Sequence, residues 1–405
     1  MENINELFEF IKNHAREDVR NLALKWHGRD LQFDLQDALM QIEARQKCAT
    51  KLPWFLAYDH FLFPSLQSSE QATNQAVALY HSYIIGSDRK VADMTAGLGI
   101  DAMTFALNNC EVTAYEIDKT RALTLEHNAK MLGLDRLSVA NEDSIATLSR
   151  TDQLYDWIFI DPARRDNSDV RCFRLQDSLP DVTVNEQMLL SHARRVLIKG
   201  SPLLDITQTL RDLKHVETIH IVSFRGECKE VLIELGHDVS VPAIHVIDIE
   251  QSNDVFPTGV PSSAYELSCQ ACDLGDSGMI YAGSGDLIPG NYLCETGAGI
   301  RKLNCGSLLS SRFPDIKSFT KNSGLYISSV APAGFPGKVS RIVSFHDSKG
   351  LKRMKGERLR IVSRAYPVGA ADIRRKYALR EGDGRSLICT STGDGRNIFI
   401  LTEDV

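Results

Sequence analysis

Long apolar runs are missing from this sequence of 405 residues, and aromatic residues make up only 7% of it. No stretch approaches the roughly 20 consecutive apolar residues that a membrane-spanning helix needs. The first residues, MENINELFEFIKNHARED, are charged and lack the apolar core of a signal peptide. These absences predict a soluble, cytoplasmic protein with no membrane partner.

A disulfide or metal-binding framework is also missing. The nine cysteines are scattered and odd in number, which is typical of reduced thiols in a cytosolic protein. Cys269 and Cys272 form a Cys-x-x-Cys pair. Only Cys294 and Cys305 lie near enough to complete the about four ligands that zinc needs, and their spacing is irregular. We therefore expect no bound metal.

Acidic residues outnumber basic ones overall, but one segment has an excess of positive charge. The formal net charge is −7, which argues weakly against nucleic acid. From Val339 onward, however, 14 Lys and Arg stand against 8 Asp and Glu, whereas the preceding residues carry 32 basic and 45 acidic side chains. Such asymmetry favours contact between the C-terminal segment and a polyanion, with a solvated basic surface as the alternative.

The first part of the chain, residues 1–85, has apolar side chains at helical spacing and is expected to be a helical region. Within it, Ser68 and Gln71 have the spacing of a capping box. This pattern predicts that one helix begins there and runs through Ala76 and Tyr80.

Residues 86–250 alternate between apolar strands and helices, which predicts an α/β fold with a Rossmann-like, doubly wound and mostly parallel sheet. A turn-rich stretch follows, and then two small α+β modules are expected at 283–330 and 339–405. The expected strands of the main sheet are Val91–Met94, Glu111–Glu116, Leu137–Asn141, Trp157–Asp161, Arg195–Lys199, Thr218–Ser223 and Val231–Leu235.

The clearest motif is VADMTAGLGIDAMTFAL, at residues 91–107. A short apolar strand ends in Asp93, and a turn containing Thr95, Gly97 and Gly99 leads into a helix. Glycine allows positive φ and a close approach of the backbone to a ligand, and the first amides of the helix face that ligand. The motif therefore predicts a nucleotide-like cofactor.

Two acidic residues follow the next two strands. Glu116 ends the second strand, where a carboxylate can accept hydrogen bonds from both ribose hydroxyls of an adenosine. Asp143 follows the third strand, where we expect a contact with the adenine amine. Both positions suit any cofactor that contains adenosine.

Two cofactor classes compete for this motif. Gly97, Gly99 and Ala102 satisfy the relaxed dinucleotide fingerprint, so an NAD- or FAD-dependent oxidoreductase is the rival hypothesis. Asp93 instead lies where methyltransferases place a carboxylate near the methionine ammonium. The motif also follows a long helical region, whereas dinucleotide domains often begin with it. Together these features favour S-adenosylmethionine.

The fourth strand continues into WIFIDPARRD, at residues 157–166. Many base-modifying methyltransferases carry Asp/Asn-Pro-Pro-aromatic here, and its acid and proline carbonyl align an amine with the methyl group. Arg164 replaces the aromatic residue, but a guanidinium can stack on a base or bind a phosphate. We expect Asp161, Pro162 and Arg164 to position the substrate, with a surface ion pair as the alternative for Arg164.

Lys199 and Ser201 end the fifth strand in LIKGSPLLDI. They either lie over the substrate or form an ordinary turn between a strand and a helix.

The absence of a Pro-Cys pair at the fourth strand counts against a cysteine-adduct route to cytosine C5.

Several motifs together resemble those of a bacterial family of class I S-adenosylmethionine-dependent methyltransferases with a C-terminal THUMP-like domain. The matching segments are LPWFLAYDHFLFPSLQSSEQAT, DMTAGLGIDAMTFA, FIDPARRD, LIKGSPLLDI, YLCETGAGIRKLNCG and residues 341–384. The resemblance implies a helical region, a catalytic domain, a ferredoxin-like module at 283–330 and a THUMP-like module at 339–405. THUMP domains are associated with RNA modification, so RNA is the implied substrate class.

The basic residues of the C-terminal module fit that implication. Side chains that neutralise phosphates give an affinity that is independent of sequence and sensitive to salt. Tyr366 and Tyr377 could stack on bases, although a place in the core is the simpler interpretation. The expected RNA contacts are Lys352, Arg353, Lys355, Arg358, Arg374 and Arg375.

The sequence thus predicts an S-adenosylmethionine-dependent enzyme that methylates RNA. A small-molecule methyltransferase whose C-terminal modules serve oligomerisation is one alternative. The other is a non-catalytic RNA-binding protein with a vestigial cofactor fold, against which the intact Glu116 and Asp161 speak.

Overall fold

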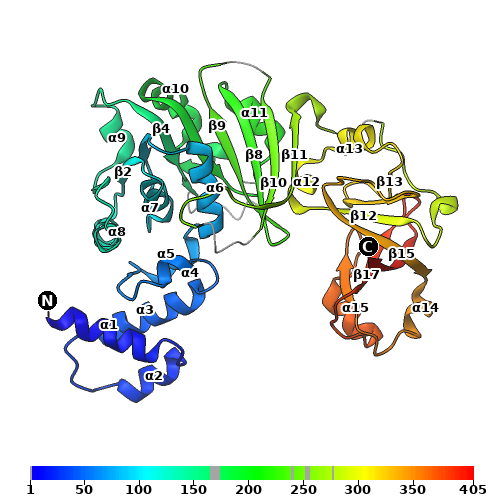
Figure 1. The fold of residues 1–405 in the computed structure, drawn as a ribbon, viewed down its shortest axis with the longest axis horizontal. Helices are drawn as coiled ribbons and strands as arrows, with labels where there is room; N and C mark the ends of the chain where they lie inside the picture. The colour runs from blue at the N-terminus through cyan, green and yellow to red at the C-terminus, as the bar shows by residue number, and fades with distance from the viewer. Residues whose placement is uncertain (1, 165–173, 239–240, 251–255, 276–277) are drawn as a thin grey trace. The chain divides into compact units, whose positions relative to one another are not determined.

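The computed structural model describes residues 2–164, 174–238, 241–250, 256–275 and 278–405. The chain divides into two compact units (Figure 1). The first unit consists of Met1–Ile219, Glu230–Ser240 and Ile249–Ser262, and the second of His220–Lys229, Val241–Asp248 and Ser263–Val405. In the described part of the chain, no helix is both long and apolar enough to cross a membrane.

The first unit opens with the expected helical region. Apolar side chains of its first three helices, among them Phe10, Leu22 and Ile42, share one buried cluster. Their burial follows the helical spacing of apolar residues in the sequence. The helices of this region are α1 (Glu2–His14), α2 (Val19–Trp26), α3 (Leu35–Cys48), α4 (Pro53–Leu56), α5 (Leu66–Gln71) and α6 (Gln75–Ile85).

The helix start predicted at Ser68 is wrong. Helix α5 begins after Ser65, whose hydroxyl accepts a hydrogen bond of 3.1 Å from the amide of Ser68. Helix α6 then begins after Asn74, whose side chain accepts a hydrogen bond of 2.9 Å from the amide of Ala76. Asn at this place offers the backbone a cap instead of a continuing helix. The break puts Thr73 in a loop between two helices.

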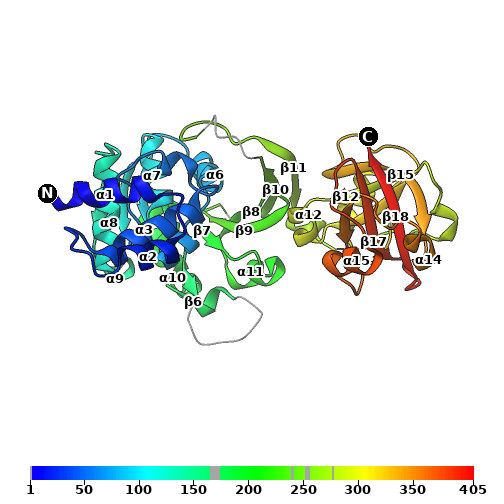
Figure 2. The same cartoon turned by 90° about the horizontal axis from the view of Figure 1, so that it is seen from below.

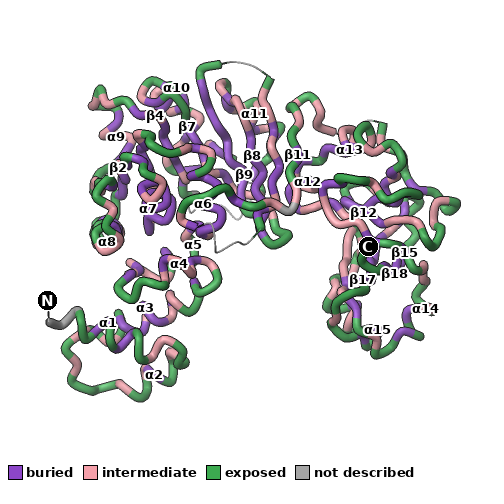
Figure 3. The backbone as a smooth tube through the Cα atoms, viewed as in Figure 1, coloured by how far each residue is buried: buried purple, intermediate pink, exposed green. Residues whose placement is uncertain are grey.

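The centre of the first unit is a parallel sheet, and every strand predicted for it is confirmed to within a few residues. Neighbouring strands β3, β2, β1, β4 and β7 are parallel. Helices α6 and α7 lie on one side of these strands and α10 and α11 on the other (Figure 2). Figure 3 shows the central strands mostly buried, as continuous apolar runs predict for a sheet covered on both faces.

The elements of this sheet follow the β-α-β order that its sequence pattern predicts. They are β1 (Lys90–Asp93), α7 (Ile100–Leu107), β2 (Glu111–Tyr115), α8 (Lys119–Met131), β3 (Leu137–Ala140), α9 (Ser144–Leu148), β4 (Tyr155–Ile160), α10 (Val182–His192), β7 (Ala193–Gly200) and α11 (Ile206–Asp212). A short hairpin of β5 (Ala163–Arg164) and β6 (Ser178–Leu179) follows β4, and the 3-10 turn η1 (Leu175–Asp177) precedes β6.

The strands after α11 change the character of the sheet. β9 (Glu227–Leu235) pairs antiparallel with β7, which explains why the sheet is only mostly parallel. β8 (Val216–Phe224), β10 (Ala243–Ile249) and β11 (Ser263–Gln270) complete the order β11-β10-β8-β9-β7-β4-β1-β2-β3.

The second unit contains a seven-stranded sheet of order β13-β14-β12-β15-β18-β17-β16. β12 pairs with β14 on one side and β15 on the other, so elements expected as separate modules at 283–330 and 339–405 contribute to one sheet. Its elements are η2 (Ala271–Asp273), η3 (Ser284–Asp286), β12 (Tyr292–Thr296), α12 (Ala298–Leu303), α13 (Gly306–Arg312), β13 (Lys317–Ser318), β14 (Leu325–Ser328), β15 (Gly337–His346), α14 (Ser348–Lys352), β16 (Arg360–Ser363), α15 (Ala370–Tyr377), β17 (Arg385–Ser391) and β18 (Asn397–Asp404).

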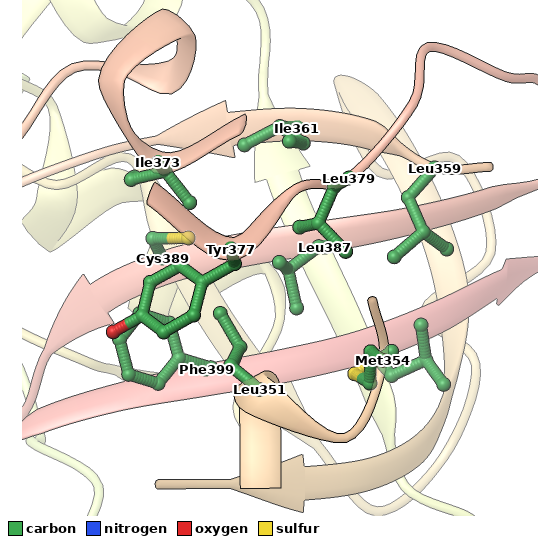
Figure 4. Packing of buried hydrophobic residues seen from close by; sticks show 11 residues of the cluster. Leu351, Met354, Leu359, Ile361, Ile373, Tyr377, Leu379, Leu387, Cys389 and Phe399 are labelled. Atoms are coloured by element: carbon green, nitrogen blue, oxygen red, sulfur yellow. The ribbon is translucent and has the colours of Figure 1, made fainter. Parts of the chain in front are cut away.

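One buried cluster joins the helices of this unit to its last strands. Tyr377 is only 5% exposed, and its ring centroid lies 6.2 Å from that of Phe399. Both rings pack among Leu351, Leu387 and other apolar side chains (Figure 4). Tyr366 is partly buried against the same cluster. The core interpretation is therefore confirmed for Tyr377, whereas Tyr366 lies at the margin of this cluster.

Candidate active site at the carboxyl ends of the parallel strands

The loop after β1 has the geometry that its glycines predict. Gly97 and Gly99 have φ of +57° and +84°, in the left-handed region that favours glycine. A Cβ on Gly99 would also collide with the side chain of Leu125 in α8, so any other residue here would force Leu125 to move. Asp93, at the end of β1, is buried and accepts a hydrogen bond of 3.1 Å from the amide of Thr95.

Glu116 follows β2 and fastens the glycine loop. Its Oε2 accepts a hydrogen bond of 2.9 Å from the amide of Gly97, and its Oε1 accepts one of 2.8 Å from the amide of Asp118. A carboxylate oxygen can accept more than one hydrogen bond, so both oxygens retain capacity for a ligand. Next to it Ile117 is 71% exposed, an apolar surface beside an acid at the same strand end.

Asp143 lies after β3 and is exposed, but its carboxylate has a structural role. It is the N-cap of α9 and accepts 3.0 Å from the amide of Ala146. Asn141, before it, donates 2.8 Å to the carbonyl oxygen of Glu116 and so ties the ends of β2 and β3 together. A contact between Asp143 and an adenine remains a prediction.

The DPARR motif follows β4 at the same edge of the sheet. The amide of Asp161 donates 2.7 Å to the hydroxyl of Thr95, which joins this motif to the glycine loop. Pro162 is buried, and the backbone of Arg164 pairs with Ser178 in the short hairpin. The side chain of Arg164 and all of Arg165 lie outside the described residues.

Lys199, at the end of β7, makes the substrate motif part of a charge network. Its Nζ donates a hydrogen bond of 2.6 Å to Oδ2 of Asp161 and one of 3.1 Å to the hydroxyl oxygen of Thr73. The Lys199 side chain is 14% exposed and that of Asp161 is 40% exposed. Asp161 is therefore the more accessible member of the pair.

Three buried groups extend the network beneath Thr73. The Thr73 hydroxyl donates 2.6 Å to Asp101, in the first turn of α7. Asp101 lies 2.8 Å from Nδ1 of His81 in α6, and Nε2 of His81 contacts Glu230 of β9. All of these residues belong to the first unit.

The charges of the network determine its protonation. Burial lowers the pKa of His81, but Glu230 and Asp101 outweigh it and raise that pKa to about 9. Burial lowers the pKa of Lys199 as well, yet the carboxylates of Asp161, Asp101 and Glu230 raise it above its usual value. Both groups are thus cations at neutral pH, and each is paired.

Asp93 is the exception among the acids. Its burial, assisted by the nearby charge of Asp101, raises the pKa of the Asp93 carboxyl well above its usual value. Among the described residues, no basic side chain forms an ion pair with it. A buried carboxyl in this position gains most from a ligand that brings a positive charge.

The six expected RNA contacts lie in or near α14 and α15 of the second unit. Lys352, Arg353, Lys355 and Arg358 are exposed, and none forms an ion pair with a described acidic residue. By contrast, Arg374 pairs with Glu381, and Arg375 pairs with Asp372. The six expected RNA contacts therefore differ in how much of their charge is available.

Sequence reasoning missed Thr73, His81, Asp101 and Glu230. Some signal was present, because His81 lies in the apolar helix QAVALYHSYII and Asp101 comes two residues after Gly99. A polar residue in so apolar a helix needs a buried partner. Its partner Glu230, however, lies 149 residues away, and no local pattern connects the two.

Comparisons with known proteins agree with this architecture. Residues 338–404 match the family described as THUMP domain-like. A segment of 101 residues is 34% identical to ribosomal RNA small subunit methyltransferase J of Haemophilus ducreyi, and the match covers 23% of this chain and 39% of that protein.

A solved structure resembles the whole chain. It is that of a candidate methyltransferase from Porphyromonas gingivalis W83, with a TM-score of 0.81 and 22% identity over 100% of this chain and 98% of that one. At this identity the likeness concerns the fold. The chain thus shares the fold of that structure, and its residues 338–404 are similar to the THUMP domain-like family.

Proposed function

We propose that this protein is an S-adenosylmethionine-dependent methyltransferase that acts on RNA. The observation that carries the cofactor assignment is Asp93, a buried carboxyl without a cationic partner among the described residues, beside a glycine loop of positive φ. Asp161 lies at the neighbouring strand end, joined to that loop through Thr95. The methyltransferase fold supports the same assignment.

The charges around Asp93 favour this cofactor over NAD. S-adenosylmethionine carries an ammonium and a sulfonium, whereas NAD carries a negatively charged pyrophosphate. Asp93 would hold the ammonium, the amides of the Gly97 loop would face the methionine part, and Glu116 would accept from the ribose hydroxyls. Ile117, 71% exposed, offers an apolar surface for the adenine.

The residues of the site have little covalent chemistry to perform. When bound, S-adenosylmethionine supplies an activated methyl group. Asp161 accepts a hydrogen bond from the acceptor amine and so fixes the direction of its lone pair, as orientation alone removes a large part of such a barrier. Pro162, which is buried, fixes the backbone that carries this carboxylate.

RNA is proposed as the substrate for two reasons. The H. ducreyi relative is named as a ribosomal RNA methyltransferase, and the second unit carries a THUMP-like domain. In that domain Lys352, Arg353, Lys355 and Arg358 present exposed charge that suits a phosphate backbone.

Calorimetry with the full-length protein tests the cofactor. S-adenosylhomocysteine, which keeps the ammonium and the adenosine, should bind, and NAD should not. Binding of NAD without any response to S-adenosylhomocysteine would favour the oxidoreductase hypothesis. Nucleoside mass spectrometry of RNA from cells that lack the gene then tests the substrate, because one methylated nucleoside should be missing.

A further inference from the structure

We propose that Lys199 is a positioning residue that holds the carboxylate of Asp161 toward the acceptor nitrogen, and that Thr73 holds Lys199 in turn. This inference rests on the proposed function, because it assigns further residues to the site for the acceptor. It also makes the loop between α5 and α6 part of that site. The loop lies outside the catalytic domain of residues 86–250 that the sequence predicts.

The sheet brings the ion pair together. Ile160 of β4 is paired with Ile198 of β7 in parallel register, so Asp161 and Lys199 follow at the same level of adjacent strands. Their oxygen and nitrogen are 2.6 Å apart. An ammonium has no preferred direction of its own, and a second fixed contact is needed to hold it in place.

Thr73 supplies that second contact. Its hydroxyl has one proton, which it donates to Asp101 in a hydrogen bond of 2.6 Å. A lone pair of the same oxygen is therefore free to accept a hydrogen bond of 3.1 Å from Lys199. Asp101 is held by His81, whose other ring nitrogen contacts Glu230. Because each group is fixed by the next, the position of Lys199 depends on the N-terminal helical region.

The surroundings of Asp161 explain why a cation is needed there. Although the Asp161 side chain is 40% exposed, partial loss of solvent raises the pKa of its carboxyl. Lys199 opposes that effect, and the charges of Asp101 and Glu230 add to it. Without Lys199, Asp161 would therefore face mainly other carboxylates and would take up a proton more readily. The charged groups around it are Lys199 of β7, Asp93 of β1, Asp101 of α7, His81 of α6 and Glu230 of β9.

The first experiment is a carboxyl titration that needs neither RNA nor cofactor. Full-length protein labelled with ¹³C at aspartate carboxyls is titrated by NMR, and the signal of Asp161 is assigned by its loss in Asp161→Asn. Lys199→Met should raise the pKa of Asp161 by about 1 unit or more, since an adjacent opposite charge lowers a carboxyl pKa by roughly 1–3 units. Lys199→Arg should restore most of the difference.

A matched pair at Thr73 tests the second half of the proposal. Thr73→Val removes the bridging hydroxyl at nearly constant volume, whereas Thr73→Ser keeps it. Thr73→Val should shift the titration of Asp161 in the same direction as Lys199→Met but by less, and Thr73→Ser should resemble the wild type. This pair decides the question even if Lys199→Met fails to fold, as a thermal melt would show.

The pH profile of methyl transfer is the second measurement. Activity should appear as pH rises and Asp161 ionises, so Lys199→Met should move the acid limb to higher pH by the same amount as the NMR titration. Affinity for S-adenosylhomocysteine should stay unchanged.

An unshifted Asp161 titration in Lys199→Met, or equal behaviour of Thr73→Val and Thr73→Ser, would overturn the proposal. The expected NMR shifts in a protein that transfers no methyl group to any RNA would support the role of Lys199 and overturn the RNA function.

Discussion

Charge is used in opposite ways in the two units of this molecule. In the first unit, Lys199 and His81 are enclosed. His81 contacts the carboxylates of Asp101 and Glu230. Lys199 contacts the carboxylate of Asp161 and the hydroxyl of Thr73. In the second, Lys352, Arg353 and Lys355 are exposed and have no ion-pair partner among described residues. Enclosed charges define a geometry, because each is costly to leave unpaired. Exposed ones supply attraction over a distance that salt screens.

The comparison predicts different failures for the two units. A substitution in the enclosed network should abolish a specific step, and its effect should depend on the shape of the new side chain. A substitution on the exposed surface should weaken binding gradually and in proportion to the charge removed. The following four expectations test that difference, from the largest effect to the smallest.

Asp161→Asn should have the largest effect, a fall in the rate of methyl transfer by roughly 100-fold or more, because misplacement of a reacting group can cost that much. Affinity for S-adenosylhomocysteine, measured by calorimetry, should change little. Asp152→Asn changes an exposed aspartate before the other end of β4 and serves as the control. Equal loss of cofactor binding and turnover would place Asp161 in the cofactor site instead.

Glu116→Ala should weaken cofactor binding by about 1.5–3 kcal/mol, the usual contribution of hydrogen bonds to a charged group. The amide of Gly97 also loses its acceptor, which loosens the glycine loop. Glu126→Ala removes the same charge from an exposed position on α8 and should bind normally. If Glu116→Ala also bound normally, the ribose contact would be wrong.

Cofactor affinity should increase with pH through the titration of Asp93. The free carboxyl has a raised pKa, and an ammonium beside it would lower that pKa. Binding therefore releases a proton between the two values, and affinity rises with pH until the raised pKa is passed. Calorimetry in buffers of different ionisation enthalpy measures this proton, and Asp93→Asn should abolish both the release and the pH dependence.

The smallest effect is expected from the exposed surface. Replacing Lys352, Arg353 and Lys355 by alanine should reduce the slope of log RNA affinity against log salt by up to about 2, from roughly 0.7 per single-strand phosphate contact. Arg374→Ala with Arg375→Ala should change the slope less, because both arginines already pair with acids. An unchanged slope in the triple variant would leave this surface without a role in binding.

Local patterns were sufficient where one short segment decides the structure. Apolar runs predicted the strands up to Val231–Leu235, and the glycine turn placed Asp93 and Glu116 at one edge of the sheet. The helix start at Ser68 was mistaken because a plausible cap in the sequence lay inside α5, while Asn74 made the real one.

Contacts between distant segments could not be predicted in this way. Lys199 contacts Thr73, which lies 126 residues away in the sequence, and no local sequence pattern at either residue indicates this contact. The same holds for the shared sheet of the second unit, in which β12 lies between β14 and β15. A turn-rich stretch and the family resemblance separated residues 283–330 from 339–405, but backbone hydrogen bonds unite them in one sheet.

The route of the chain has a consequence for how such a protein could arise. An end-to-end gene fusion joins two domains at one point, but here the chain passes between the units at residues 219, 229, 240, 248 and 262. Two of these points fall inside or beside the strands β8 and β9. Because the residues of the two units alternate along the chain, no single truncation removes one unit without removing part of the other, so we expect the two units to be inherited together rather than exchanged.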